Sequence, residues 1–316
     1  MKLSTAYQGY RTTKLGEGMS ESTLVIYDWV FKEMIAQLGD PEVDKITKQD
    51  LNGFMFHMRH NYKTRAQKPL SSSSLDNAWK GIRSFFKWAF EDLGIERPDI
   101  NLARPKVTSR EIQPFTAEEV EKLLRACAQT KVYETNGRRR FRRKRESGLR
   151  DRAMVLLLLD TGLRVSEMCR LKIKDVDVKH GDVYVAPFGS GRKTKPRTVF
   201  LGKVARSALW RYLAERQDAQ PDDPLFVTNE GRPMTRRSVH QLIQNLGERS
   251  GVKDAHPHRF RHTFATEFLR NGGTIEVLQK LLGHSTLTMS LRYAEIAQSD
   301  IESAHRKASP ADRWRL

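Results

Sequence analysis

The spacing of apolar and polar positions along the chain is mainly helical. Apolar side chains recur three and four positions apart over residues 24–38 and 75–93, and a shorter stretch of the same kind follows Thr47. This spacing places them on one face of a helix, and a glycine stands directly after each of the two longer stretches, where helices commonly end. These helices predict a compact helical domain over residues 20–96, with residues 1–19 as an extension before it.

Helical spacing stops over residues 97–113, where prolines interrupt a polar, basic stretch, so this segment is predicted to link two domains. Beyond it, residues 182–187 and 197–201 look like two short strands around a turn rich in glycine and lysine. The remaining spacing predicts helices after Thr116 and at residues 151–160, 203–217, 235–250, 258–271, 274–282, 286–294 and 297–305. The second domain therefore covers residues 114–316, and the expected fold class is mainly α with a small antiparallel β-sheet (α+β).

Composition narrows the class of partner. The 316 residues include 56 Lys and Arg against 38 Asp and Glu, a net charge of +18, and so large an excess indicates a polyanion, with nucleic acid first and an anionic membrane surface second. No apolar run approaches the roughly 20 residues of a spanning helix, and the first 21 residues lack a signal peptide. The two cysteines, Cys127 and Cys169, suit a reducing compartment. We expect a cytoplasmic protein on DNA or RNA, with no membrane partner.

One segment concentrates this charge. Seven of eight consecutive positions are cationic, and these candidate DNA-binding residues are Arg138, Arg139, Arg140, Arg142, Arg143, Lys144 and Arg145. Such a segment is either a solvated loop that repels itself or a set of phosphate contacts. We favour phosphate contacts, which strengthen binding without reading base sequence.

Reactive residue types gather first in two segments of the second domain. Arg164 opens a predicted helix with Glu167 one turn later; its forked guanidinium suits bidentate capture of a phosphate, and the alternative is a simple Arg–Glu pair. In the glycine-rich turn, Lys193 and Lys195 could reach a phosphodiester, where a lysine can serve as a general acid. Alone, that turn is only a basic turn.

Two further segments follow nearer the C-terminus. His258 and Arg261 share a helix face, an arrangement suited to an anion. His258 and His262 also have the i,i+4 spacing of zinc helices, but no glutamate lies between them and no cysteine is near, so no metal site is expected. His284 precedes Tyr293 by nine residues. Taken alone, such a tyrosine is usually a core residue with a wet hydroxyl.

Together the four segments resemble the tyrosine recombinase (phage-type integrase) family in order, type and spacing. The family pattern is an Arg in T-G-L-R-x-S-E, a Lys in a β-hairpin, H-x-x-R, L-G-H and a Tyr nine residues later. The resemblance implies a helical core-binding domain, a catalytic domain and no metal, ATP or other cofactor. The catalytic residues that it implies are Arg164, Lys193, His258, Arg261, His284 and Tyr293, with Glu167 and Lys195 in supporting roles.

The family mechanism implies that Tyr293 attacks a scissile phosphate, leaving a 3′-phosphotyrosyl link and a free 5′-hydroxyl. A free tyrosine has a pKa of ~10 and needs help at neutral pH. Arg164 and Arg261 would hold the non-bridging oxygens, His258 would accept or relay the tyrosine proton, and His284 would donate another hydrogen bond.

One departure concerns the lysine. The family hairpin usually places it five residues before the arginine that closes the turn, and counting back from Arg197 gives Arg192. Because arginine essentially never releases its proton, we expect a one-residue shift that makes Lys193, ahead of Lys195, the general acid.

The resemblance also implies partners: duplex DNA recombination sites, a homotetramer on two sites with a dimer on each, and accessory DNA-bending or directionality factors. Residues 297–305 could form a helix that docks on a neighbouring protomer or packs on its own domain. The alternatives are a type IB topoisomerase-like enzyme and a non-catalytic DNA-binding protein with a decayed site. A metal-dependent nuclease would need clustered carboxylates, which the sequence lacks.

Overall fold

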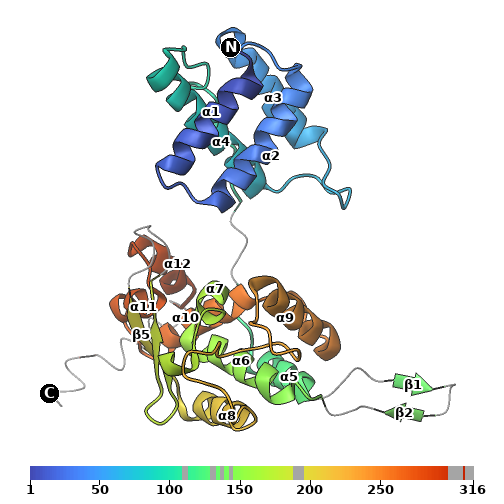
Figure 1. The fold of residues 1–316 in the computed structure, drawn as a ribbon, viewed down its shortest axis with the longest axis vertical. Coiled ribbons are helices and arrows are strands. Elements are labelled where there is room, and N and C mark those ends of the chain that lie inside the picture. Colours follow the sequence, from blue (N-terminus) through green and yellow to red (C-terminus); the bar gives the residue numbers. More distant parts are fainter. Residues whose placement is uncertain are drawn as a thin grey trace. The chain divides into compact units, whose positions relative to one another are not determined.

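The computed structural model describes residues 1–108, 113–128, 133–135, 139–141, 145–187, 196–297 and 309. The chain divides into two compact units, Met1–Glu111 and Ile112–Leu316, and each is described by itself. Both are built mainly from helices, and the second also contains a small antiparallel sheet, so the predicted fold class is confirmed (Figure 1).

The first unit is a bundle of helices around an aromatic core. Its helices are α1 (Leu3–Gly16), α2 (Glu21–Leu38), α3 (Lys48–His60) and α4 (Ser72–Leu93), with a 3₁₀ turn at Val43–Lys45. Three of the starts are capped by side chains: the hydroxyls of Ser20, Thr47 and Ser71 each accept a hydrogen bond from a backbone N–H of the first turn. Gly39 and Gly94, both with positive φ, end α2 and α4. Local chemistry therefore sets these boundaries.

Helix α1 departs from the expectation that residues 1–19 precede the domain as an extension. Leu3, Tyr7 and Tyr10 are buried in the bundle, and the ring of Tyr7 stacks on that of Phe31 with 4.3 Å between centroids. The segment is polar on average, but its apolar residues recur at helical spacing and therefore face the core together. The first unit thus begins at the N-terminus.

Part of the predicted linker also belongs to the first unit. Asp99 and Leu102 are buried, and the indole Nε1 of Trp79 donates a hydrogen bond to the carbonyl of Leu102 at 2.9 Å. The division between the two units falls near residue 111, inside the stretch 97–113.

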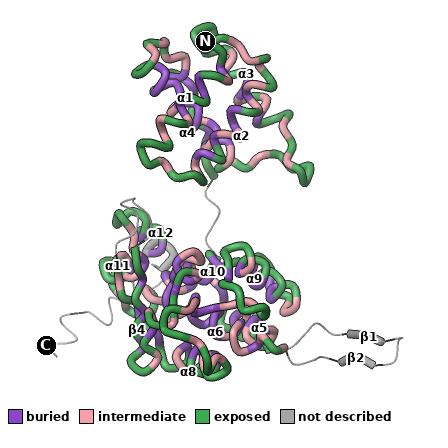
Figure 2. Tube along the Cα trace, in the orientation of Figure 1, coloured by how far each residue is buried: buried purple, intermediate pink, exposed green. Residues whose placement is uncertain are grey.

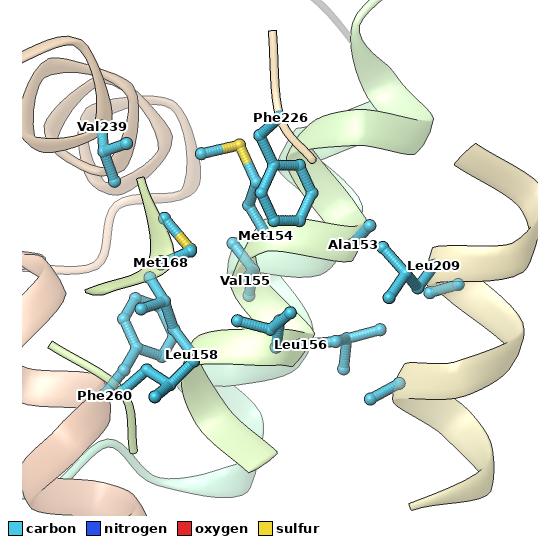
Figure 3. Close-up of a cluster of buried hydrophobic side chains, with 14 of the residues drawn as sticks. Ala153, Met154, Val155, Leu156, Leu158, Met168, Leu209, Phe226, Val239 and Phe260 are labelled. Atoms are coloured by element: carbon cyan, nitrogen blue, oxygen red, sulfur yellow. The ribbon is translucent and has the colours of Figure 1, made fainter. Parts of the chain in front are cut away.

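The second unit is arranged around one buried helix. Its helices are α5 (Ala117–Ala128), α6 (Gly148–Thr161), α7 (Val165–Met168), α8 (Lys203–Leu213), α9 (Arg236–Ser250), α10 (Pro257–Arg270), α11 (Ile275–Leu282) and α12 (Thr288–Ala297), with a 3₁₀ turn at Ile173–Asp175. Helix α6 packs against α5, α8 and α10 and is buried along most of its length (Figure 2). Figure 3 shows its Met154, Val155 and Leu158 in a cluster that includes Phe226 and Phe260. A helix that is apolar on most sides is stable only at such a centre.

The small sheet has the order β3-β4-β5, formed by Val176–Asp177, Asp182–Val185 and Arg197–Phe200, with antiparallel neighbours. Val183 pairs with Val199, and both are buried on the face toward the core. Strands β4 and β5 were predicted, whereas β3 is only two residues long and leaves no periodic signal. The turn between β4 and β5, with Lys193 and Lys195, lies outside the described residues.

The basic segment contributes to a second, two-stranded ladder. Strand β1 (Tyr133–Thr135) pairs antiparallel with β2 (Arg139–Phe141), so the backbone of Arg139 and Arg140 is in a strand. Arg138, Arg142, Arg143 and Lys144 lie outside the described residues. No helix in the described part of the chain is long and apolar enough to cross a membrane.

Candidate active site

Arg261 occupies the centre of the candidate site. It projects from α10, is 2% exposed, and donates hydrogen bonds from Nη1 to the carbonyl of Gly162 and from Nη2 to the carbonyl of Leu282, both at 2.8 Å. These carbonyls lie at the C-terminal ends of α6 and α11, where helix dipoles favour a cation. Burial, and then the charge of Arg164, lowers the pKa of Arg261 to about 9, so the group is cationic at neutral pH. It therefore ties two helix ends together and keeps further N–H donors for a ligand.

Arg164, the residue directly before α7, approaches the same point. Its backbone N–H and Nη1 donate to the carboxylate of Glu167 at 2.8 and 3.2 Å, and Nη1 also lies 3.4 Å from the carbonyl of Leu282. The Arg–Glu pair weighed as an alternative from the sequence is therefore formed. This pair leaves other N–H donors of the guanidinium group available, and the side chain of Arg164 remains 31% exposed beside that of Arg261.

Arg197, on β5, holds Glu167 in place. Its Nη1 and Nη2 donate to the two oxygens of Glu167 at 3.1 and 2.8 Å, and its Nε donates to the carbonyl of Leu281 at 2.7 Å. Burial alone would raise the pKa of Glu167, but the hydrogen bonds and charges of Arg197 and Arg164 keep it below its ordinary value. Two guanidinium groups thus contact one carboxylate. With Arg261 beside them, the three arginines and Glu167 give the pocket a net positive charge suited to an anion.

Two histidines of α10 lie beside this pocket. His258 and His262 are one turn apart, and their rings meet edge to face with 4.5 Å between centroids. His262 contacts the nucleophile candidate directly, because its Nδ1 lies 2.9 Å from the hydroxyl of Tyr293. Partial burial, followed by neighbouring positive charge and the other histidines, lowers the pKa of each ring to about 4. Both are therefore neutral at pH 7.

His284 follows the glycine that ends α11. Its Nδ1 is hydrogen bonded to the hydroxyl of Ser290 at 2.8 Å, and Ser290 is completely buried on α12. This contact orients the imidazole through one nitrogen and leaves Nε2 available to a ligand. The ring lies parallel to that of Tyr293, with 6.4 Å between centroids. Burial, and then the charges of Arg261 and Arg164, lowers the pKa of His284 to about 4.

Tyr293 lies on α12 and is 2% exposed. Its ring belongs to a small apolar cluster with Ala265, Leu278 and Leu282. Burial raises the pKa of its hydroxyl, while the nearby charges of Arg261 and other arginines oppose that rise. The ring is therefore packed as in the core position weighed from the sequence, while the hydroxyl is hydrogen bonded to His262.

The structure brings together most of the residues singled out in the sequence. Arg164, Glu167, His258, Arg261, His284 and Tyr293 all lie in one region of the second unit, whereas Lys193 and Lys195 lie outside the described residues. Sequence reasoning did not assign site roles to Arg197, His262 and Ser290. The available signals were that Arg197 closes the basic turn and that His262 follows Arg261 directly.

Arg145, at the end of the basic segment, departs from the expectation of DNA contact. Its side chain is 15% exposed and forms a 2.6 Å ion pair with the fully buried Asp151, and it also donates to the carbonyl of Cys127. A buried carboxylate requires such a partner, so Arg145 serves the fold. Within the described residues, no cluster of three or more histidine, cysteine or acidic side chains is placed to hold a metal ion.

Comparison with known proteins identifies the family. The model of the phage integrase family matches residues 113–300. The tyrosine recombinase XerC of Staphylococcus epidermidis is 34% identical over 233 residues, which cover 72% of this chain and 73% of that protein. The tyrosine recombinase XerD of Oceanobacillus iheyensis is 27% identical over 308 residues, which cover 94% and 95% of the two chains.

A solved structure has the same fold. It is the Tn1549 transposon integrase in complex with transposon right end DNA, with a TM-score of 0.72 and 20% identity, and the likeness covers 96% of this chain and 99% of that one. The relatives named above are recombinases, which favours that activity over the topoisomerase-like and non-catalytic alternatives. The chain therefore belongs to the phage integrase family and is a tyrosine-type site-specific DNA recombinase.

Proposed function

We propose that Tyr293 is the nucleophile that cleaves and rejoins duplex DNA at recombination sites, through a 3′-phosphotyrosyl intermediate. One observation carries this proposal. A buried tyrosine hydroxyl, hydrogen bonded to His262, lies in the same region as Arg261 and Arg164, whose guanidinium groups both approach the carbonyl of Leu282. A phosphodiester at these guanidinium groups would be stabilised as charge develops on its non-bridging oxygens.

The remaining roles follow from the donors that the site offers. His284, oriented through Ser290, would donate from Nε2 to a non-bridging oxygen of the scissile phosphate. Glu167 would position Arg164 without touching DNA, since it is buried beneath the arginines. His258 lies beside His262 and Arg261 and would accept or relay a proton. The covalent link conserves the bond energy of the phosphodiester, so rejoining by a 5′-hydroxyl needs neither ATP nor metal.

The leaving 5′-oxygen needs a proton, which we assign to Lys193 of the turn between β4 and β5. Lys193→Ala is expected to slow cleavage of ordinary DNA and to be rescued by a 5′-thio leaving group, because a thiolate leaves without protonation. Lys195→Ala is the matched control and should show no such rescue. Equal defects of Lys193→Ala on both substrates would remove Lys193 from this role.

The assembly follows from stoichiometry. Exchange between two duplexes requires four strand cleavages, and each protomer supplies one Tyr293, so we propose a dimer on each site and a homotetramer on two sites. Residues 297–305 are the candidate for a helix that docks on a neighbouring protomer. The basic segment around Arg139 and Arg140 would add phosphate contacts. Accessory DNA-bending or directionality factors would assist the recombination reaction, which would take place on DNA in the cytoplasm.

The decisive experiment is a nicked suicide substrate incubated with the protein in EDTA. The short fragment that carries the free 5′-hydroxyl diffuses away after cleavage, which prevents rejoining. A covalent protein–DNA adduct should therefore accumulate with the wild-type protein and be absent with Tyr293→Phe. Mobility-shift binding of the same DNA should persist in that variant. Binding without any adduct on matched sites would reduce the protein to a DNA-binding function.

A further inference from the structure

The hydroxyl of Tyr293 has a specific partner that the family pattern does not assign. The pattern implies that His258 receives the tyrosine proton, yet the nitrogen at hydrogen-bond distance is Nδ1 of His262, 2.9 Å from the hydroxyl oxygen. Helices α10 and α12 pack closely, and His262 lies one turn further along α10 than His258, opposite Tyr293. His258 meets the ring of His262, with 4.5 Å between centroids.

We propose that His262 is a further catalytic residue, which orients the hydroxyl of Tyr293 and accepts its proton as the nucleophile attacks. The inference rests on the proposed role of Tyr293. Geometry is the first requirement for a general base, and a heavy-atom distance of about 2.6–3.2 Å is the range for direct proton transfer. His262 meets this requirement.

The step balances in atoms and electrons. The lone pair on Nδ1 of His262 takes the proton of the Tyr293 hydroxyl, and the freed electron pair on the phenolic oxygen forms the bond to phosphorus. The bond between phosphorus and the 5′-oxygen breaks, and that oxygen takes a proton from the lysine of the β4–β5 turn. In rejoining, the 5′-hydroxyl returns its proton to that lysine and forms the bond to phosphorus. The bond between phosphorus and the Tyr293 oxygen breaks, and this oxygen recovers its proton from His262.

The electrostatics of the site would couple this base to the substrate. Besides burial, the groups that hold the pKa of His262 at about 4 are His258, His256 and Arg261 of α10 and its N-terminus, and Arg292 of α12. A phosphodiester bound to Arg261 adds a negative charge that offsets this positive field, so it raises the pKa of the imidazole. The same anion disfavours spontaneous ionisation of Tyr293, which makes a proton acceptor necessary. His262 therefore becomes a better base when the substrate is in place.

If the contact between His262 and Tyr293 were purely structural, a substitution that keeps the hydrogen bond would leave the rate unchanged. His262→Asn therefore distinguishes a structural contact from a proton acceptor. Asparagine can place an amide group near the position of Nδ1 and keep a hydrogen bond to Tyr293, but it does not bind a proton in the neutral range. His256→Asn is the matched control on the same helix. His256 caps α10 through its side chain, and asparagine is among the strongest N-caps. Burial lowers the pKa of His256, so its ring is uncharged at pH 7, and the variant should retain its structure and its rate at that pH.

The measurement is the single-turnover rate of covalent adduct formation on a nicked suicide duplex, at saturating protein, from pH 5 to 9. The wild-type rate should fall at acid pH as the base becomes protonated. His262→Asn should lower the rate by about 10²–10⁴-fold at pH 7, lose the acid limb, and recover part of the defect at high pH as Tyr293 ionises unaided. Its circular dichroism and its DNA affinity should match those of His256→Asn.

Two results would overturn the inference. A His262→Asn protein that reacts at the wild-type rate with the same acid limb would leave only a positioning contact. An acid limb that vanishes in His258→Asn but persists in His262→Asn would assign the proton to His258. If the wild-type protein forms no adduct, the proposed function fails instead, and this outcome is distinct from both.

Discussion

Replacing Gly162 by alanine perturbs the backbone turn on which the arginine pocket is built. Gly162 ends α6 with φ of +60°, and an added Cβ would lie 2.4 Å from Cδ1 of Phe264 and 2.9 Å from Cδ2 of Leu282. The left-handed conformation costs alanine about 1–2 kcal/mol. Because Leu282 is fully buried and Phe264 is packed against it, the clash adds roughly 1–3 kcal/mol of overpacking. The total loss of stability is about 2–5 kcal/mol.

Gly251→Ala is the matched control. Gly251 ends α9 in the same unit with φ of +74°, and nothing lies within 4 Å of its added Cβ, so only the backbone cost of about 1–2 kcal/mol applies. Urea denaturation of the full chain, followed by circular dichroism at 222 nm, measures both variants against the wild type. The first unit is common to all three proteins, so any shift in the transition reports the second unit.

The difference between the two variants isolates the steric contribution, expected at about 1–3 kcal/mol. Equal losses, within roughly 0.5 kcal/mol, would refute the reasoning, because they would mean that the neighbours of Gly162 move aside at no cost. Activity gives a second readout. The carbonyl of Gly162 accepts a hydrogen bond from Arg261, so Gly162→Ala should reduce cleavage more than DNA binding, whereas Gly251→Ala should not.

Two further predictions concern the support of the site. Glu167→Ala leaves the buried Arg197 without its carboxylate, so it should cost about 3–5 kcal/mol in urea unfolding at pH 7. Because the pKa of Glu167 is lowered by folding, its contribution should be complete above about pH 5 and be lost as pH falls through the depressed pKa. A loss of stability in Glu167→Ala that stays the same size at acid pH would contradict this prediction. Ser290→Ala removes the hydrogen-bond partner of His284 and should slow adduct formation. Ser290→Thr keeps a hydroxyl at this position and should retain the wild-type rate. Equal rates of adduct formation in Ser290→Ala and the wild type would exclude a positioning role for Ser290.

Much of the fold could be predicted from signals that act between neighbouring residues of the sequence. Helices α2, α3 and α4 were predicted because amphipathic spacing and a serine or threonine cap act within a few neighbouring residues, and α2 and α4 also end at a glycine. Helix α1 was not predicted, since a segment that is polar on average becomes helical only because Tyr7 and its neighbours find an aromatic core to cover. Strand β3 likewise exists through pairing with β4.

The candidate site divides in the same way. By itself the sequence determined the chemistry available: a basic chain, two arginines, histidines and a tyrosine at fixed spacings, which was enough for the family and for most candidate residues. Only the tertiary structure decided which atoms meet. Arg197 reaches Glu167 across thirty residues, and His262 faces Tyr293 because of how α10 lies against α12. The physical reason is that spacing along a helix specifies a face, whereas the packing of another helix selects which turn of that face makes contact.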